Sequence, residues 1–322
     1  MSELEPPIFV VGCFRGGTTL LERVLLSHPE LAGPGFETQL FSRVRYGRTL
    51  DHPAEYAALT AGVRANGDAV ARFTAAVDEL TRRQGARCWV EKSPEHVYHA
   101  RAIVTCFPGA RIVYIVRDAR DVVTSILHTP WALPHARGRQ PRVVAGAVLW
   151  ELMTFAGLRV LADPTFAPAV LAVSYESLVR EPPVELRRLA AFLGLPGDNE
   201  SIAGWLRRSG EIEANSLIEP ELRGISASPV GRWRDRRQLA EDEVAVVQYL
   251  VGPTLVRTGY ELAETKQLPR TTCARVAAAK AAWVAIRAQR YAKTIGRGVP
   301  PHFVADARAS LLPLLGVGPP TR

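Results

Sequence analysis

The stretch IFVVGCFRGGTT, residues 8–19, joins an apolar run to a glycine-rich turn. Its first part, Ile8–Gly12, is short and continuously apolar, which is typical of a parallel strand buried on both faces. A helical pattern follows from Leu20 to Ser27. Between strand and helix, backbone N–H groups and the positive end of the helix dipole would face an anion. The turn residues that would hold this anion are Arg15, Gly16, Gly17, Thr18 and Thr19.

This turn differs at one position from the loop that binds nucleoside triphosphates. The pattern GxxxxGK[ST] has a lysine before the final hydroxyl, and Thr18 stands there instead. The positive charge lies inside the loop at Arg15, whose guanidinium can bind a single phosphate or sulfate through two hydrogen bonds. The alternative is a glycine turn that only tightens the connection between strand and helix.

Two further apolar runs, Arg111–Val116 and Val170–Ser174, are strand-like and are each followed by a helical pattern. Three such units predict an α/β, P-loop-like, three-layer fold with a central parallel sheet flanked by helices. Alanine-rich helices are expected at about 54–84 and 143–161, and a loop rich in proline and glycine at 129–142.

Charge divides the chain into two parts. Residues 265–322 contain ten of the 40 Lys and Arg residues and one acidic residue, so they carry +9, and residues 1–264 carry −1. We expect residues 1–264 to form the catalytic domain and 265–322 a basic, helical C-terminal extension. Such a helix can contact an anionic membrane, the body of the protein (residues 1–264) or a second copy of the chain. The body has no basic excess, so no nucleic-acid partner is expected.

The start of the chain and its cysteines predict the compartment. MSELEPP lacks the basic and apolar parts of a secretory signal, and no run of about 18 apolar residues is present, so a cytoplasmic location is expected. The four cysteines have neither CxxC spacing nor histidines in a ligand pattern. We therefore expect reduced thiols and no metal site.

Two basic residues outside the glycine turn are candidates for chemistry. Lys92 is the only lysine among residues 1–265, and an ammonium can approach a bridging oxygen, although codon bias would also explain a lone lysine. Arg117 follows a strand-like run, and Ser125 lies two turns into the next helix, which Asp118 can cap. Arg117 and Ser125 could bind a second anion at the carboxyl edge of the sheet. A surface ion pair of Arg117 with its acidic neighbours is the alternative.

Together these residues resemble the sulfotransferases that use 3′-phosphoadenosine 5′-phosphosulfate (PAPS), over roughly residues 8–262. The resemblance implies that the loop from Arg15 to Thr19 binds the 5′-phosphosulfate. It implies equally that Arg117 and Ser125 bind the 3′-phosphate.

Two later segments extend this resemblance. Tyr175 begins a YESL segment similar to one whose tyrosine lies beside the adenine in the family, and an ordinary core aromatic is the alternative. Arg232 and Trp233, in the segment GRWR, resemble the late loop that closes over the cofactor.

The expected catalytic base is Glu37. Within the family the chain looks nearest to the protein-tyrosine sulfotransferases and similar bacterial proteins, whose catalytic glutamate lies in a GEET-like segment, and GFET stands there at 35–38. The histidine of the aryl and steroid branch is absent, because Ser93 follows Lys92. A solvated loop carboxylate is the alternative for Glu37, and His96 and His99 are the next candidates for the base.

The resemblance implies that a sulfuryl group passes from PAPS to an acceptor hydroxyl by in-line displacement. Glu37 would take the proton, Lys92 and Arg15 would meet the charge of the donor, and no metal would be needed. A small molecule, a glycan or a peptide could provide the hydroxyl. The alternatives are a P-loop kinase or other nucleotide-binding protein, and a non-catalytic nucleotide-binding module.

Overall fold

One parallel sheet of five strands organises the chain, in a computed structural model that describes residues 4–41, 69–129, 132–133, 135–212 and 223–295, with side chains up to residue 286. The strand order is β2–β3–β1–β4–β5. Their bounds are β1 (Ile8–Gly12), β2 (Leu31–Ala32), β3 (Cys88–Lys92), β4 (Arg111–Val116) and β5 (Val170–Ser174). β1 therefore lies in the centre, where it pairs in parallel with β3 and β4.

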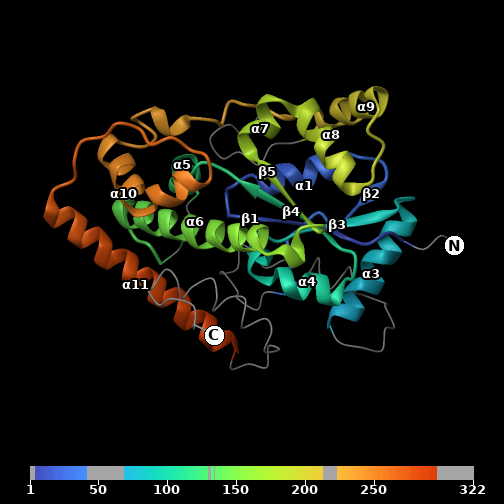
Figure 1. Cartoon of the computed structure of the whole chain (residues 1–322), viewed down its shortest axis with the longest axis horizontal. Coiled ribbons are helices and arrows are strands. Elements are labelled where there is room, and N and C mark those ends of the chain that lie inside the picture. Colours follow the sequence, from blue (N-terminus) through green and yellow to red (C-terminus); the bar gives the residue numbers. More distant parts are fainter. Residues whose placement is uncertain (1–3, 42–68, 130–131, 134, 213–222, 296–322) are drawn as a thin grey trace.

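Helices cover both faces of this sheet (Figure 1). One layer contains α1 (Thr18–Leu26), α7 (Tyr175–Arg180), α8 (Pro182–Leu193) and α9 (Asn199–Ser209). The other contains α3 (Ala69–Arg83), α4 (Ala100–Cys106), α5 (Ala119–Leu127), α6 (Arg139–Ala162), α10 (Glu241–Arg257) and α11 (Arg270–Ile295). Short 3-10 helices lie at η1 (Pro94–His99), η2 (Pro164–Phe166) and η3 (Arg232–Arg234). The three-layer α/β fold expected from the sequence is confirmed.

The alternation of side chains along β1 explains the two layers. Phe9 and Val11 belong to the core under α6 and α10, and Ile8 and Val10 belong to the core under α1 and α8. All five residues of β1 are buried, so both faces of this strand must be apolar.

The three expected strands occur at the expected residues, whereas β2 and β3 were not expected and one loop differs in length. β3 was not expected, because CWVEK ends on two charged residues that break the apolar run. The loop expected at 129–142 is shorter, because α6 begins at Arg139. Pro141 lies in the first turn of α6, where proline needs no N–H partner. For the helix expected at 54–84, residues 54–68 lie outside the described residues, and α3 accounts for the rest.

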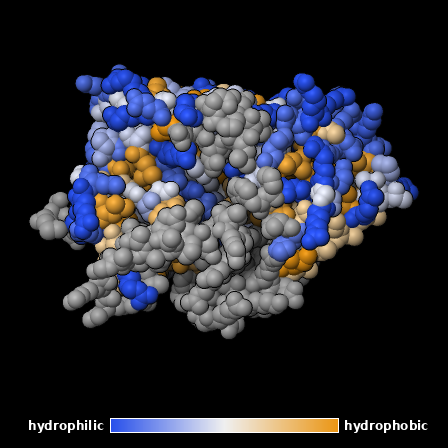
Figure 2. Space-filling model, turned by 180° about the vertical axis from the view of Figure 1, so that it is seen from behind, coloured by the Kyte–Doolittle hydropathy of each residue, from blue (hydrophilic) through white to orange (hydrophobic). Residues whose placement is uncertain are grey.

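α6 is the central helix of its layer. By length and composition it could cross a membrane, but 78% of its most apolar window is buried inside the fold. α11 packs against α6 and α10: Lys280 Nζ lies 2.6 Å from Glu151 Oε2, and Val276 and Val284 are buried in the same core. The described part of the C-terminal extension is thus docked on the body. On the face seen in Figure 2, the coloured apolar residues form several separate areas between polar ones.

Candidate active site

The expected site residues gather at the carboxyl edge of the sheet. Arg15 follows β1, Lys92 ends β3, Arg117 follows β4 and Tyr175 follows β5. Because all strands are parallel, these four ends meet at one edge, where ligands bind in open α/β sheets.

The glycine-rich loop after β1 has a backbone shaped for close approach. Arg15 has a φ of 63°, in the left-handed region that is costly for a residue other than glycine. Gly17 has a φ of 102°, and a Cβ on it would lie 2.3 Å from Tyr175 Cδ2. Gly17 is also the N-cap of α1 and offers no side-chain cap. The first N–H groups of α1 are therefore left for other acceptors.

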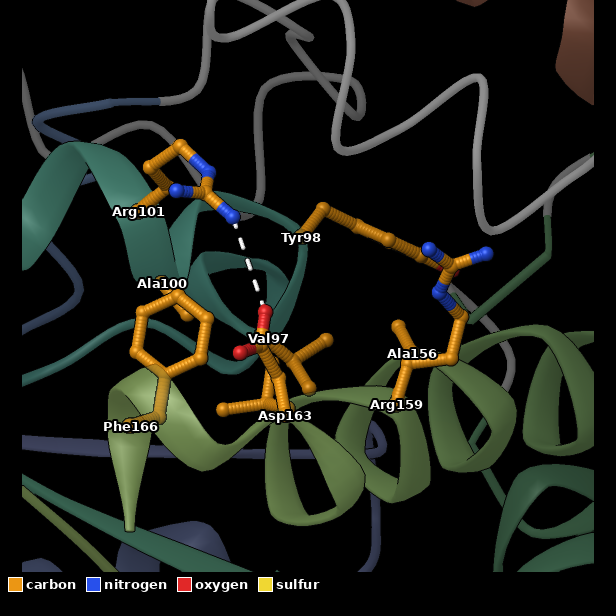
Figure 3. Close-up of a pocket in the computed structure, with 9 residues that line it drawn as sticks. Val97, Tyr98, Ala100, Arg101, Ala156, Arg159, Asp163 and Phe166 are labelled. Atoms are coloured by element: carbon orange, nitrogen blue, oxygen red, sulfur yellow. Dashed lines mark ion pairs between the residues drawn. The ribbon is translucent and has the colours of Figure 1, made fainter. Parts of the chain in front are cut away.

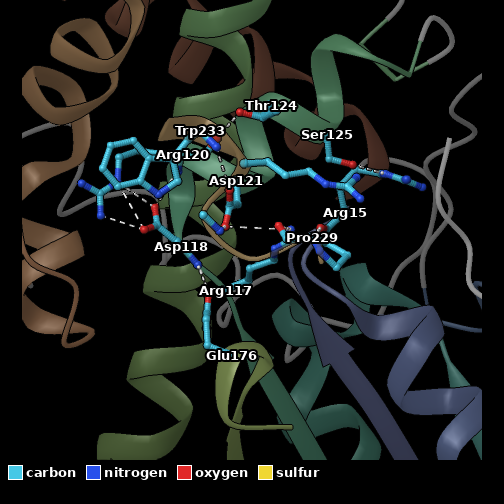
Figure 4. Close-up of polar contacts among 12 residues, drawn as sticks. Arg15, Arg117, Asp118, Arg120, Asp121, Thr124, Ser125, Glu176, Pro229 and Trp233 are labelled. Carbon is cyan, nitrogen blue, oxygen red and sulfur yellow. Dashed lines mark hydrogen bonds and ion pairs between the residues drawn. The ribbon is translucent and has the colours of Figure 1, made fainter. Parts of the chain in front are cut away.

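Two arginines converge beside this loop (Figure 4). Arg15 Nε donates to Ser125 Oγ at 3.0 Å, and Arg117 Nη1 lies 3.5 Å from the carbonyl oxygen of Arg15. Burial and the nearby charge of Arg117 lower the pKa of Arg15 to about 10. The Arg117 guanidinium lies 4.2 Å from the ring centroid of Tyr175 and Arg117 is 7% exposed. Its Nη2 lies 4.0 Å from Asp121 Oδ2, so an ion pair with an acidic neighbour is present, but it is buried and not at the surface. Its Nε is buried and has no hydrogen-bond partner among the described residues. Like charges held together in this way favour an anion between them.

The late loop, which contains η3, is held against α5 by backbone hydrogen bonds. Asp121 Oδ2 accepts from Gly231 N at 2.7 Å, and Asp121 Oδ1 accepts from Trp233 N at 3.1 Å. Arg117 Nη2 donates to the carbonyl oxygen of Pro229 at 2.7 Å. These contacts place the late loop next to the two arginines (Figure 4).

Within this loop, Trp233 is largely buried. The guanidinium carbons of Arg120 and Arg234 lie 3.9 and 4.4 Å from its ring centroid. The indole thus packs against two cations of the chain itself. Arg232 is half-buried, and its Nη2 lies 3.5 Å from Ser228 Oγ.

Glu176 ties the YESL segment to its neighbours. Its carboxylate accepts from Asp118 N at 3.1 Å, from Ser174 Oγ at 3.0 Å and from Tyr260 Oη at 2.8 Å. Asp118 in turn caps α5 by accepting from Arg120 N at 2.8 Å, as the sequence predicted. Glu176 thereby holds the ends of β4 and β5 and the end of the body together.

Lys92 and Glu37 form an ion pair at the end of β3. Lys92 Nζ lies 2.8 Å from Glu37 Oε1, with side chains 5% and 15% exposed. Glu37 is therefore not a solvated loop carboxylate. Lys92 pairs with Val10 of β1, and its Nζ lies 3.7 Å from Glu22 Oε2 of α1, so this ion pair lies beside the glycine-rich loop that joins β1 to α1.

A buried carboxylate, Glu91, anchors the segment that follows Glu37. Glu91 Oε1 accepts from Thr38 Oγ1 at 2.7 Å and from Ser93 Oγ at 2.6 Å, and Glu91 Oε2 lies 2.9 Å from His96 Nδ1. Burial opposes the charge on Glu91, but its contact with His96 and the hydrogen bonds from Ser93 and Thr38 outweigh this and lower its pKa. Gln39 N donates to Ser93 Oγ at 2.9 Å, so backbone and side chain of this segment share one network.

His96 completes this network. Its Nε2 accepts from Phe41 N at 3.2 Å, so Nδ1 carries the hydrogen that Glu91 accepts. Both ring nitrogens are occupied and the side chain is fully buried. His96 thus has an anchoring role in the structure.

A pocket of about 60 Å³ lies apart from these residues, between η1 and α4 on one side and the end of α6 on the other (Figure 3). Arg101 Nη2 lies 3.5 Å from Asp163 Oδ2 at its rim, and Phe166 lines it. None of the site residues expected from the sequence lines this pocket.

A family model for the sulfotransferase family matches residues 6–200, which is more than half of the chain. The chain belongs to the sulfotransferase family. The sulfotransferase domain from the curacin biosynthetic pathway has a similar fold, with a TM-score of 0.54 at 18% identity over 81% of this chain and 100% of that domain.

Three curated relatives are each similar to most of this sulfotransferase. The nodulation protein NoeE of Sinorhizobium fredii is 27% identical, over 81% of this chain and 67% of its own length. The omega-hydroxy-beta-dihydromenaquinone-9 sulfotransferase Stf3 of Mycobacterium tuberculosis is 26% identical, over 80% of this chain and 76% of its own. Protein-tyrosine sulfotransferase A of Caenorhabditis elegans is 27% identical, over 80% and 68%. The resemblance to protein-tyrosine and bacterial sulfotransferases is thus confirmed.

The structure of this sulfotransferase brings the expected residues together in two adjoining groups. The anion group contains the loop from Arg15 to Thr19 with Arg117, Ser125 and Tyr175, and the ion pair of Glu37 and Lys92 adjoins it. Ser125 contacts Arg15 itself, so the side chains expected at two separate phosphates lie in one cluster. Which phosphate each contacts, and whether Arg232 and Trp233 contact the cofactor, stay predictions.

Sequence reasoning missed two carboxylates of the site, Glu22 and Glu91. Glu22 lies on α1 with its Oε2 3.7 Å from Lys92 Nζ. The signal for Glu22 is a lone acid on the apolar face formed by Leu21 and Leu25. Glu91 had no such signal: Ser93 and His96 follow it closely, but its third partner, Thr38, comes from a distant segment.

Proposed function

We propose that this sulfotransferase transfers a sulfuryl group from PAPS to an acceptor hydroxyl, with Glu37 as general base. The observation that carries the proposal is the 2.8 Å contact between Lys92 and Glu37 beside the loop that contains Arg15. An acid–base pair beside an anion-binding loop is the arrangement that sulfuryl transfer requires.

The described residues fit an anionic donor. α1 begins without a side-chain cap, Arg15 is buried close to a second arginine, and Arg117 Nε has no hydrogen-bond partner among the described residues. A phosphosulfate supplies the oxygen acceptors and negative charge that such donors need. Arg117, Ser125 and the late loop around Arg232 would bind the 3′-phosphate, and Tyr175 would lie beside the adenine.

Each residue of the ion pair has one role in this reaction. Glu37 accepts the proton of the acceptor hydroxyl while the acceptor oxygen forms a bond to sulfur. Lys92 offsets the negative charge on the bridging oxygen as its bond to sulfur breaks. The products are a sulfate ester and 3′-phosphoadenosine 5′-phosphate (PAP).

The acceptor can belong to one of several classes of hydroxyl compound. Two relatives are named for a protein tyrosine and for the terminal hydroxyl of a menaquinone. The GEET-like segment of the family has two adjacent acids, and Phe36 replaces the first of them here. The segment therefore carries one negative charge fewer, which favours an acceptor with less positive charge. We further propose that the protein works in the cytoplasm and that residues 265–322 serve its contacts with membrane or with a second copy.

The test is a panel of tyrosine peptides, phenols, glycans and hydroxylated lipids incubated with PAPS and the full chain. One acceptor class should gain the mass of one sulfuryl group, and Lys92→Met should lower that rate by about 10²-fold or more. Lys280→Met is the matched control, because Lys280 pairs with Glu151 in the α6–α11 contact, and it should stay active. No sulfate ester from any class, together with tighter binding of ATP than of PAP, would favour a kinase instead.

A further inference from the structure

Glu22 is a buried carboxylate that the reaction above does not use. It lies on α1, one turn after Thr18, and its side chain is 4% exposed. Its Oε1 is buried and has no hydrogen-bond partner among the described residues. A buried carboxylate with so few partners is costly, so its position calls for a reason.

Two carboxylates from different elements face the ammonium of Lys92. Glu37, from the segment after β2, makes the close contact at 2.8 Å. Glu22, from α1, lies at 3.7 Å, which is within reach of an ion pair but too long for a hydrogen bond. A small movement of Lys92 would therefore exchange one partner for the other.

The reaction itself favours this exchange. Once Glu37 has accepted the proton of the acceptor, it is neutral, and Glu22 and the leaving oxygen are the remaining negative partners of Lys92. An ammonium at 5% exposure needs such partners, because an uncompensated buried charge is strongly unfavourable. We propose that Glu22 is a positioning residue that becomes the ion-pair partner of Lys92 when Glu37 is protonated, and so keeps the ammonium at the leaving oxygen. The inference rests on the proposed function.

The charges around Glu22 support this exchange. Burial raises the pKa of Glu22 to about 7; the charge of Lys92 lowers it, those of Glu91 and Glu37 raise it, and that of Arg23 lowers it. Neutralising Glu37 removes one raising charge and frees Lys92 to approach, so both effects lower the pKa of Glu22. The ionised form of Glu22 is therefore favoured when Glu37 is neutral.

Carboxyl carbon NMR on the full chain tests this coupling without any assay of activity. Glu37→Gln imitates the protonated base and should lower the titration midpoint of Glu22 by about one pH unit or more. Glu30→Gln is the matched control, because Glu30 is a surface acid paired with Arg87 at 3.0 Å, and it should leave the midpoint unchanged. A midpoint that is equal in Glu37→Gln and in the wild type overturns the proposal.

Turnover tests the consequence for catalysis. Glu22→Gln should lower kcat about tenfold at unchanged affinity for PAP, and Glu22→Asp, which keeps the charge, should recover part of it. The wild type should also lose kcat as the pH falls below the lowered titration midpoint of Glu22 found in Glu37→Gln, and Glu22→Gln should lack this limb. Unchanged kcat and pH profile in Glu22→Gln overturn the proposal. A wild type that transfers no sulfuryl group, but shows the NMR shift, refutes the proposed function while supporting the exchange of partners.

Discussion

Removing the hydroxyl of Thr38 should loosen the segment that carries Glu37. In Thr38→Val the hydrogen bond of 2.7 Å to Glu91 is lost together with the longer one of 3.3 Å that Leu40 N donates to Thr38 Oγ1, whereas the bonds of Glu91 to Ser93 and His96 remain. A hydrogen bond to a charged group contributes about 2 kcal/mol. The free energy that holds the segment closed should fall by this amount, which raises the population of the open form about 30-fold.

Native-state hydrogen exchange measures this opening directly. The amides of Gln39 and Phe41 donate to Ser93 Oγ and His96 Nε2, so they exchange only when the segment opens. Both should exchange about 30-fold faster in Thr38→Val, and turnover should fall while PAP affinity is retained.

Two other threonine substitutions serve as controls for this experiment. Thr38→Ser keeps the hydroxyl and should behave as the wild type. Thr81→Val removes a buried hydroxyl that donates to the carbonyl oxygen of Val77 at 2.7 Å, away from the Glu91 network, and should leave the two amides unchanged. Equal exchange at Gln39 and Phe41 in Thr38→Val and wild type would refute the anchoring role of Glu91.

Four further outcomes are expected. Glu37→Gln should lower turnover by roughly 10²- to 10⁴-fold and keep PAP affinity in calorimetry; near-normal turnover would move the base elsewhere. Arg117→Ala should erase most of the preference for PAP over 5′-AMP, and equal affinities in the wild type would contradict the donor assignment. Because the pKa of folded Glu22 is about 7 against an ordinary 4.5, the folded state binds the extra proton between these values, so stability falls as pH rises through them. The melting temperature of Glu22→Gln relative to wild type should therefore rise from about pH 5 to pH 8, and parallel curves would argue against a buried, strained carboxylate. Deleting residues 265–322 should lower solubility or change the oligomer in light scattering; an unchanged oligomer with loss of salt-sensitive binding to anionic vesicles would indicate a membrane role.

The sequence was sufficient for the frame of the sheet, because β1, β4 and β5 are apolar runs bounded by turn residues. It was not sufficient for β3, where Glu91 and Lys92 continue a buried strand with charged side chains. These charges are stable there only because partners from other segments surround them. A run of apolar residues predicts a buried strand, but a strand that carries the charged residues of a site lacks such a run and is missed.

Part of the candidate site could be predicted from the sequence, and part of it could not. Arg15 and Arg117 could be placed at one edge because each follows an expected strand of a parallel sheet, whereas Lys92 stood out only as a lone lysine. The role of His96 could not be predicted, since its partner Phe41 lies 55 residues away and is brought to it only by the fold. His96 is offset from the histidine position of the aryl and steroid branch, so the sequence left it as an alternative base. In the structure it anchors the segment that follows Glu37.

The central place of β1 has a consequence for the synthesis of the protein on the ribosome. β1 is the first strand to be synthesised, yet both of its neighbours come much later: Ile8 pairs with Val90 on one side and with Arg111 on the other. At about 5–20 residues per second, a separation of roughly 100 residues leaves this apolar strand without partners for roughly 5–20 s. During that interval both of its edges can pair with other chains. The growing chain should therefore depend on chaperones that shield its first strand, and expression at lower temperature or with added chaperones should increase the soluble yield.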